Sequence, residues 1–298
     1  MQNISVIGAG TMGNGIAHVL AQYGFRVNLV DTQAAQLDKA ILSITRNMDR
    51  QVAKGMLKEE EKQAALARIT RHQNPSAGVG QADLVVEAAT ENTDLKLNLF
   101  RQLDEAAPAG CILASNTSSI SITKIAAATR RPRSVIGMHF MNPVPVMRLV
   151  EIINGYATDP AVTRQIVELS VQLGKEPCVV NDYPGFIANR ILMPMINEAI
   201  YSLYEGVSGV REIDTVMKLG MAHPMGPLQL ADFIGLDTCH SILKVLHDGF
   251  GNPKYAPCPL LTNMVTAGNL GVKSGEGFYK YTPGSKELTV SGRFKGSV

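Results

Sequence analysis

His139 and Glu151 are the two side chains whose types suit a proton transfer. The pKa of histidine lies near neutrality, so an imidazole can take the proton of an alcohol while a hydride leaves the same carbon. A carboxylate on the other ring nitrogen fixes the tautomer and stabilises the imidazolium. The pair therefore indicates hydride-transfer chemistry. A histidine satisfied at a strand end is the other interpretation, and the spacing alone favours neither.

Two predicted strands position this pair. Residues 134–139 and 148–153 are apolar runs typical of strands, and the proline-stiffened segment 141–147 (MNPVPVM) joins them. A parallel crossover needs roughly a dozen residues or more, and this connection is shorter. The strands are therefore expected to be antiparallel, which can return Glu151 to the side of His139.

A run of small polar residues, 115–119 (SNTSS), follows another predicted strand, 111–115. Ligands of open α/β sheets bind at the carboxyl ends of the strands, where this run lies. Small hydroxyl side chains also cap helices, and the spacing favours both interpretations equally.

The glycines of the N-terminal stretch predict a dinucleotide site. An apolar strand leads into a GxGxxG turn and an amphipathic helix. Gly8 allows the tight turn, Gly10 lets the backbone approach a pyrophosphate, and Gly13 lets the helix pack on the sheet. The N–H groups at the start of that helix then face the phosphates. A purely structural turn is the alternative.

Asp31 indicates which dinucleotide binds. It ends the predicted strand 25–30 and lies 18 residues after Gly13. A carboxylate that binds the ribose 2′-hydroxyl is expected roughly 20 residues after the motif. It would repel a 2′-phosphate, and no arginine follows it. NAD is therefore favoured over NADP as the cofactor.

The composition excludes several classes of protein. The 298 residues are 45% hydrophobic and 18% charged, as in soluble globular proteins of one large or two ordinary domains. A formal net charge of +2 predicts no nucleic-acid partner and no membrane-surface affinity. Because no stretch is long and apolar enough to span a bilayer and a strand begins within three residues, we expect a cytoplasmic protein.

The cysteines and histidines predict no metal site. Cys111, Cys178, Cys239 and Cys258 form no CxxC pair, which favours reduced, mostly buried thiols over a disulfide framework. No two histidines have the helical spacing of metal ligands with a nearby acid.

The alternation of strands and helices stops after residue 181, so two domains are predicted. The fold class is α/β, with a Rossmann-type, mostly parallel sheet domain over residues 1–182 followed by an all-helical C-terminal domain over residues 183–281. The polar, aperiodic residues 282–298 are expected to be a loosely ordered tail. Helices are predicted over residues 33–67 with a break near Gly55, 93–107, 160–174, 186–205 with a kink or interruption at Pro194, 210–219, and 228–250 with a possible break near Gly235.

Taken together, the motifs resemble those of the 3-hydroxyacyl-CoA dehydrogenase family, in particular its short stand-alone members. The resemblance runs from residue 2 to about residue 281. It is carried by GAGTMGNGIA, DLVVEAATENTDLKLNLF, ASNTSSISI, GMHFMNPVPVMRLVE, PGFIANR, HPMGPLQLADFIGLD and GVKSGEGFYKY.

The resemblance implies catalytic roles for four residues. His139 would be the general base and Glu151 its orienting partner. Ser118 in SNTSS and Asn189 in PGFIANR would hydrogen-bond the substrate's 3-oxygen and thioester region, which stabilises charge developing on oxygen.

The resemblance also implies cofactor and substrate contacts. Lys54 would meet the CoA moiety, and an ordinary helix-surface lysine remains the alternative for both Lys54 and Lys96. The cofactor contacts would be Gly8, Gly10, Thr11, Met12, Gly13, Asp31, Glu91, Lys96, Ser118, Asn142 and Lys273, with Asn142 near the nicotinamide.

The function implied by the resemblance is reversible NAD-linked oxidation of an (S)-3-hydroxyacyl-CoA to the 3-oxoacyl-CoA. A short-chain substrate such as 3-hydroxybutyryl-CoA, a place in fatty acid metabolism and a homodimer formed through the helical domain are expected. Two alternatives remain: a related dehydrogenase that acts on a free hydroxy acid or sugar acid, and a non-catalytic NAD-binding scaffold. Intact Ser118, His139, Asn142, Glu151 and Asn189 argue against the scaffold.

Overall fold

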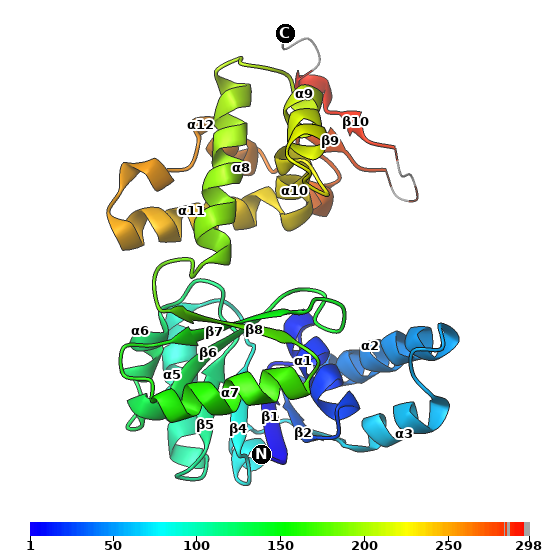
Figure 1. The fold of residues 1–298 in the computed structure, drawn as a ribbon, viewed down its shortest axis with the longest axis vertical. Coiled ribbons are helices and arrows are strands. Elements are labelled where there is room, and N and C mark those ends of the chain that lie inside the picture. Colours follow the sequence, from blue (N-terminus) through cyan, green and yellow to red (C-terminus); the bar gives the residue numbers. More distant parts are fainter. Residues whose placement is uncertain (283, 285–286, 295–298) are drawn as a thin grey trace. The chain divides into compact units, whose positions relative to one another are not determined.

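The computed structural model describes residues 1–282, 284 and 287–294. The chain folds into two compact units, Met1–Tyr183 and Pro184–Val298 (Figure 1). The division falls one residue from the boundary expected from the sequence.

The first unit is built on one eight-stranded sheet. Its order is β3-β2-β1-β4-β5-β6-β7-β8, and every neighbouring pair is parallel except β6 and β7, which are antiparallel. The Rossmann-type, mostly parallel sheet is therefore confirmed. The strands are β1 (Asn3–Ile7), β2 (Arg26–Val30), β3 (Ile69–His72), β4 (Leu84–Glu87), β5 (Ile112–Ser115), β6 (Val135–Phe140), β7 (Leu149–Asn154) and β8 (Glu176–Asn181).

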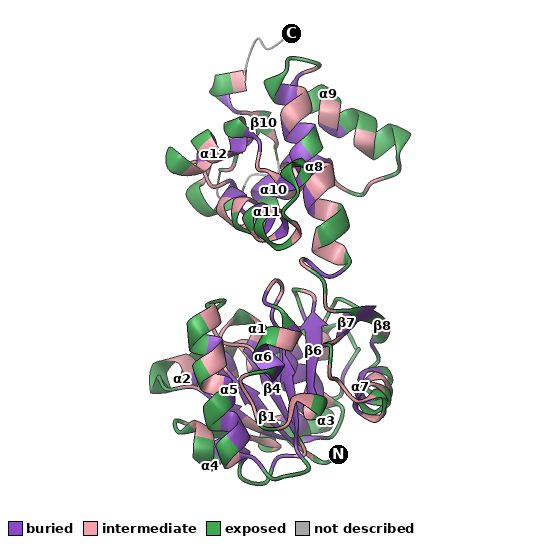
Figure 2. Ribbon diagram, turned by 90° about the vertical axis from the view of Figure 1, so that its left-hand side faces the viewer, coloured by how far each residue is buried: buried purple, intermediate pink, exposed green. Residues whose placement is uncertain are grey.

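Burial explains the continuous apolar runs of the central strands. Every residue of β4, β5 and β6 is buried, because helices cover both faces of the sheet (Figure 2). A strand with only one covered face would instead alternate polar and apolar residues.

The helices of the first unit follow local signals in the sequence. Gly55, at φ +68°, lies between α2 and α3, which confirms the predicted break. Asp159 caps α7 by accepting the N–H of Ala161 at 2.9 Å, and Pro160 occupies the first helical turn. The helices are α1 (Thr11–Gln22), α2 (Ala34–Ala53), α3 (Glu59–Ala67), α4 (Pro75–Val79), α5 (Thr93–Ala106), α6 (Ile122–Ala126) and α7 (Pro160–Gln172).

The second unit is helical, as predicted, with its own apolar core. Gly235, at φ +102°, separates α10 from α11 at the predicted break, while α8 continues through Pro194. The sequence analysis missed α12 and a two-stranded antiparallel sheet. The elements are α8 (Ala188–Tyr204), α9 (Val210–Thr215) continued by a π-helix (Val216–Gly220), α10 (Pro227–Ile234), α11 (Leu236–Phe250), α12 (Pro259–Thr266), β9 (Tyr279–Lys280) and β10 (Thr289–Val290).

The described end of the chain differs from the loosely ordered tail expected for residues 282–298. Residues 283, 285–286 and 295–298 of that expectation lie outside the described residues. In the described part, β10 pairs with β9, Ser291 is fully buried, and the Phe294 ring lies 5.7 Å from that of Phe278. Each of these contacts joins residues that are well separated in the chain, and only a few residues take part. They therefore leave no periodic apolar pattern in the sequence, and this ordered segment could not be predicted from it.

Asp232 ties the segment after α12 to α10. This fully buried carboxylate accepts the backbone N–H groups of Phe278 at 3.0 Å and Tyr279 at 2.9 Å, and the Tyr281 hydroxyl at 3.1 Å. Burial nonetheless raises the pKa of Asp232 to about 6, because removal from water outweighs these hydrogen bonds.

The raised pKa predicts a pH-dependent stability. Between about pH 4 and 6 the folded state binds this proton more tightly than the unfolded state, so the contribution is present at low pH and lost as the pH rises through 6. We expect the free energy of unfolding of the wild type, minus that of Asp232→Asn, to fall from pH 4 to 6 in denaturant titrations. A difference that rises or stays constant over this range would contradict the raised pKa.

Candidate active site

His139 and Glu151 face each other across two neighbouring strands. The antiparallel register pairs His139 on β6 directly with Glu151 on β7, which confirms the predicted strand direction. Directly opposed residues point to the same face of a sheet. The Nδ1 atom of His139 lies 2.8 Å from Oε2 of Glu151, and both side chains are buried. A carboxylate on Nδ1 makes Nε2 the ring nitrogen that can accept a substrate proton.

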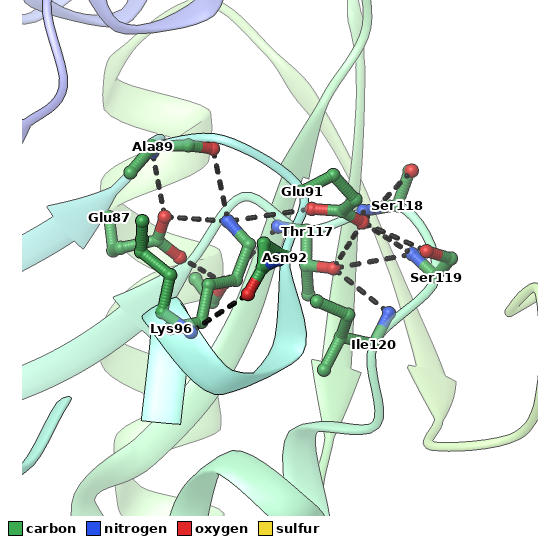
Figure 3. A network of polar contacts seen from close by, with 11 residues as sticks. Glu87, Ala89, Glu91, Asn92, Lys96, Thr117, Ser118, Ser119 and Ile120 are labelled. Carbon is green, nitrogen blue, oxygen red and sulfur yellow. Dashed lines mark hydrogen bonds and ion pairs between the residues drawn. The ribbon is translucent and has the colours of Figure 1, made fainter. Parts of the chain in front are cut away.

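Ser118 lies in a loop organised by a second carboxylate, Glu91. The two loops follow the parallel neighbours β4 and β5, so both emerge at the carboxyl edge of the sheet. Oε1 of Glu91 accepts the Thr117 hydroxyl at 2.6 Å, the Ser118 N–H at 3.0 Å and the Ser119 hydroxyl at 2.9 Å (Figure 3). Removal from water raises the pKa of Glu91, but Lys96 and these hydrogen bonds outweigh it and hold that pKa below its usual value.

The residue that caps the nearby helix α6 is Ser121, which lies just after the SNTSS run. Ser121 caps α6 by accepting the N–H of Lys124 at 3.2 Å. The hydroxyls of Ser115 and Thr117 donate to carboxylates, Ser115 to Glu87 and Thr117 to Glu91, and the Thr117 hydroxyl also accepts the N–H of Ile120 at 2.9 Å. The run is therefore a loop held by acids at the edge of the sheet.

The same edge carries the end of β6 and the residue Asn142 that follows it. The side chain of Asn116 accepts the N–H of Phe140 at 2.8 Å, which ties the SNTSS run to β6. Farther along, the buried Lys175 donates to the backbone carbonyls of Val144 at 2.5 Å and Met147 at 2.8 Å. Asn142 is exposed at the start of the segment that Lys175 holds.

The glycine turn has the geometry expected of a phosphate-binding turn. Gly8 has φ +98°, and a Cβ there would lie 2.7 Å from the carbonyl oxygen of Ala88. A Cβ on Gly13 would lie 1.7 Å from the carbonyl oxygen of Gly8, so α1 packs against the turn only without it. A Cβ on Gly10 would meet nothing within 4 Å, which leaves open space beside the start of α1, where Thr11 and Met12 lie.

A cavity of about 600 Å³ adjoins this turn and is lined by Gly8, Gly10, Asp31, Gln33 and Ala89, among others. The Asp31 carboxylate lines this cavity and is held by two backbone groups. Its Oδ2 accepts the N–H of Ala9 at 2.9 Å, and its Oδ1 accepts the N–H of Gln33 at 3.0 Å. A dinucleotide fits this site for three reasons: the size of the cavity, the open space beside the backbone of Gly10, and the carboxylate just after β2.

The two lysines assigned by resemblance differ in their surroundings. Lys96 on α5 is 1% exposed and lies 2.6 Å from Oε1 of Glu87, so the surface-lysine alternative is wrong for it. Lys54 is exposed at the C-terminal end of α2, and both interpretations of it stay open.

The second unit holds the other two predicted residues. Asn189 lies in the first turn of α8. Lys273 donates to Asp237 at 2.8 Å and to the Thr238 hydroxyl at 2.9 Å. The first unit by itself thus brings together His139 with Glu151, and Ser118 with Glu91 and Lys96.

Glu87 contacts both Lys96 and the start of the SNTSS run, and it was not singled out from the sequence. The sequence signal for Glu87 was an acid at the end of DLVVEA, a stretch whose apolar pattern predicts a buried strand. In the structure this acid is fully buried. Buried charges are paired, so this acid implied a cation nearby.

Among the described residues, no group of three or more histidine, cysteine, aspartate or glutamate side chains is arranged to hold a metal ion. None of the helices in the described part of the chain is long and apolar enough to cross a bilayer. Cys111, Cys239 and Cys258 are buried and Cys178 is exposed, all as free thiols, so the prediction of mostly buried cysteines is confirmed.

A phosphate-binding turn, an acid at the end of β2 and a paired histidine at the same sheet edge define an NAD-binding oxidoreductase. Residues 3–183 match the family description "3-hydroxyacyl-CoA dehydrogenase, NAD binding domain", and residues 185–281 match "3-hydroxyacyl-CoA dehydrogenase, C-terminal domain". The chain belongs to the 3-hydroxyacyl-CoA dehydrogenase family.

Relatives extend over almost the whole chain. A 3-hydroxybutyryl-CoA dehydrogenase of Bradyrhizobium diazoefficiens is 53% identical over 281 residues, 94% of this chain and 96% of the relative. The human mitochondrial hydroxyacyl-coenzyme A dehydrogenase is 43% identical, over 94% of this chain and 91% of that protein. The crystal structure of (S)-3-hydroxybutyryl-CoA dehydrogenase from Ralstonia eutropha has a TM-score of 0.93 at 48% identity, covering 95% of this chain and 99% of that one.

Proposed function

We propose that this protein catalyses the reversible NAD-dependent oxidation of a short-chain (S)-3-hydroxyacyl-CoA, such as 3-hydroxybutyryl-CoA, to the 3-oxoacyl-CoA. The observation that carries this proposal is the 2.8 Å contact between His139 and Glu151 at the sheet edge that also carries the glycine turn. The substrate class is supported by the names of relatives that are more than 50% identical.

The proposed mechanism assigns the proton to His139. NAD, when bound, supplies the hydride acceptor. Nε2 of His139 takes the proton of the 3-hydroxyl group, and the Glu151 carboxylate stabilises the imidazolium that forms. Ser118 and Asn189 would donate hydrogen bonds to the substrate oxygens, where negative charge develops in the reverse direction.

The remaining assignments concern binding. The turn around Gly8, Gly10 and Gly13, with Thr11 and Met12, would receive the pyrophosphate. Asp31 would bind the ribose of the adenosine, and Lys54 the CoA moiety. Around the nicotinamide half we place Glu91, Lys96, Ser118, Asn142 and Lys273.

One assay tests the reaction, the cofactor and the substrate class together. NADH consumption is followed on acetoacetyl-CoA and on free acetoacetate, with NADPH in parallel. Fast oxidation of NADH with the CoA ester alone supports the proposal. Turnover of the free acid supports the alternative dehydrogenase, and NADH binding without any turnover supports a non-catalytic scaffold.

Asp31→Ala is expected to weaken NADH binding. The substitution removes a charged acceptor for the ribose hydroxyl, a contact of about 1.5–3 kcal/mol, so KM for NADH should rise roughly tenfold or more. The ratio of kcat/KM for NADPH to that for NADH should also rise, because the carboxylate no longer repels a 2′-phosphate. Asp38→Ala, which removes an exposed partner of Arg71, is the control. An unchanged KM for NADH would remove Asp31 from the cofactor site.

We also propose that the second unit forms a homodimer. A cavity of about 400 Å³ between α8 and α9 is lined by Met195, Ile213 and Val216, among others. Of its lining residues, Val207 is 72% exposed and Val216 is 61% exposed. Apolar surface of this kind is typical of a self-association face.

Val216→Glu is expected to dissociate this dimer. An unpaired carboxylate buried in an interface costs several kcal/mol, so the Kd of dimerisation should rise at least about 100-fold. Sedimentation velocity measures the change. Val171→Glu, at an exposed site on α7 of the first unit, should leave the oligomeric state as it is. A Val216→Glu protein that stays dimeric would place the interface elsewhere.

A cytoplasmic location and a role in fatty acid metabolism complete the proposal. The four free cysteines suit a reducing compartment, and an acyl-CoA is the activated form of a fatty acid.

A further inference from the structure

Lys175 is a buried cation that is held without an ion pair. It is 8% exposed and lies between α7 and β8. Gly174, at φ +67°, ends α7, and the backbone N–H of Lys175 donates to the carbonyl oxygen of Ser170 at 3.0 Å, as in a Schellman motif. Burial lowers the pKa of Lys175, and no charged side chain in the described part of the chain offsets this effect. Uncharged groups therefore keep the ammonium group in the interior.

The groups that hold Lys175 are two backbone carbonyls of the 141–147 segment, which joins β6 to β7. Its Nζ donates to the carbonyl oxygen of Val144 at 2.5 Å and to that of Met147 at 2.8 Å. Both carbonyls belong to one turn, in which the N–H of Met147 bonds to the carbonyl oxygen of Pro143 at 2.9 Å. Since a buried ammonium group is strongly unfavourable unless its N–H groups find acceptors, Lys175 and this segment fix each other.

The same segment also packs on α1, the helix that starts at the glycine turn. Val144 is 2% exposed, and a Cβ added to Gly15 would lie 2.9 Å from the Cβ of Val144. The segment comes this close to α1 because residue 15 has no side chain. It is thus fixed in two ways, by Lys175 through its carbonyls and by α1 through the side chain of Val144.

The position of this segment decides where Asn142 lies. Asn142 is an exposed residue at its start and follows His139 by three positions. The turn that Lys175 holds begins at the next residue, Pro143. A hydrogen bond requires its two heavy atoms to lie about 3 Å apart, so a small shift of the segment would remove a contact made by the Asn142 amide.

We propose that Lys175 is a positioning residue for the cofactor site, because its ammonium group holds the 141–147 segment in the place where Asn142 meets the nicotinamide half of NAD. Lys175 acts through the backbone of the segment, and Asn142 makes the contact. The inference rests on the proposed function, which places Asn142 at the nicotinamide.

Lys175→Met tests the proposal with two ligands, NADH and ADP-ribose. The substitution removes the charge and both hydrogen bonds and keeps most of the length of the side chain. ADP-ribose contains the adenosine and the pyrophosphate but no nicotinamide. We expect the Kd for NADH, measured by isothermal titration calorimetry, to rise about fivefold, as for the loss of one hydrogen bond. The Kd for ADP-ribose should stay within about twofold, and kcat on acetoacetyl-CoA should fall about tenfold or more.

The comparison of the two ligands separates this role from a general loosening of the fold. A loosened fold would weaken both ligands equally, and that result, or unchanged binding of both, overturns the proposal. Arg164→Met, which removes an exposed cation from α7, is the control and should change neither Kd.

A double variant tests whether the effect passes through Asn142. If it does, adding Lys175→Met to Asn142→Ala raises the Kd for NADH by less than about twofold, because the contact is already lost. Fold-changes that multiply overturn the proposal. An Asn142→Ala protein with the wild-type Kd for NADH also overturns it, since Asn142 would then make no contact with the cofactor.

The outcomes remain decisive if Lys175→Met does not fold. Lys175→Gln, whose amide can still donate to one carbonyl, then takes its place, and an unchanged ratio of the two Kd values overturns the proposal. Wild-type turnover of acetoacetyl-CoA with NADH is measured first. Its absence would count against the proposed function, whereas normal wild-type turnover with unchanged Lys175 variants would count against the role of Lys175 alone.

Discussion

His139→Gln is expected to lower kcat for acetoacetyl-CoA reduction by roughly 10³-fold, because general acid–base catalysis contributes about 10²–10⁴-fold and glutamine does not titrate. The amide can still hydrogen-bond Glu151, so the strands β6 and β7 should keep their register. Since the pyrophosphate turn lies on other strands, the Kd for NADH should stay within about twofold. NADH absorbance measures the first quantity and NADH fluorescence the second.

An exposed histidine provides the control for this experiment. His247, in the last turn of α11, has a side chain that is 42% exposed. His247→Gln should leave kcat unchanged. If His139→Gln kept wild-type turnover, His139 would be a structural histidine at a strand end, and the proton would have to pass through another group.

Glu151→Gln is expected to lower kcat by about 10²-fold without unfolding the protein. The amide can donate to Nδ1, which places the proton of the neutral imidazole on Nε2 and leaves no acceptor for the substrate proton. Loss of the buried carboxylate also destabilises the imidazolium. NADH absorbance with acetoacetyl-CoA measures this rate.

The control is an exposed acid on the neighbouring strand. Glu176 on β8 has a side chain that is 69% exposed, and Glu176→Gln should leave the rate as it is. A Glu151→Gln protein with the wild-type rate would refute the orienting role.

Much of the proposed catalytic pair could be predicted because its two strands follow each other in the chain. A connection too short for a parallel crossover required β6 and β7 to be antiparallel. The sequence allowed His139 and Glu151 to meet, and the structure gives the register that places them directly opposite each other. The glycine turn was predictable for the same reason, because strand, turn and helix are consecutive in the chain.

The sequence by itself thus determined the α/β domain, the change to helices near residue 183 and the antiparallel direction of β6 and β7. Only the tertiary structure decided that Lys96 is buried, that Glu87 neutralises it and that residues 289–290 return to pair with β9. The hydrogen bond from Ser115 to Glu87 joins side chains 28 residues apart. The physical reason is that the solvation of a charge depends on which distant segments cover it, and no local period in the sequence records those segments.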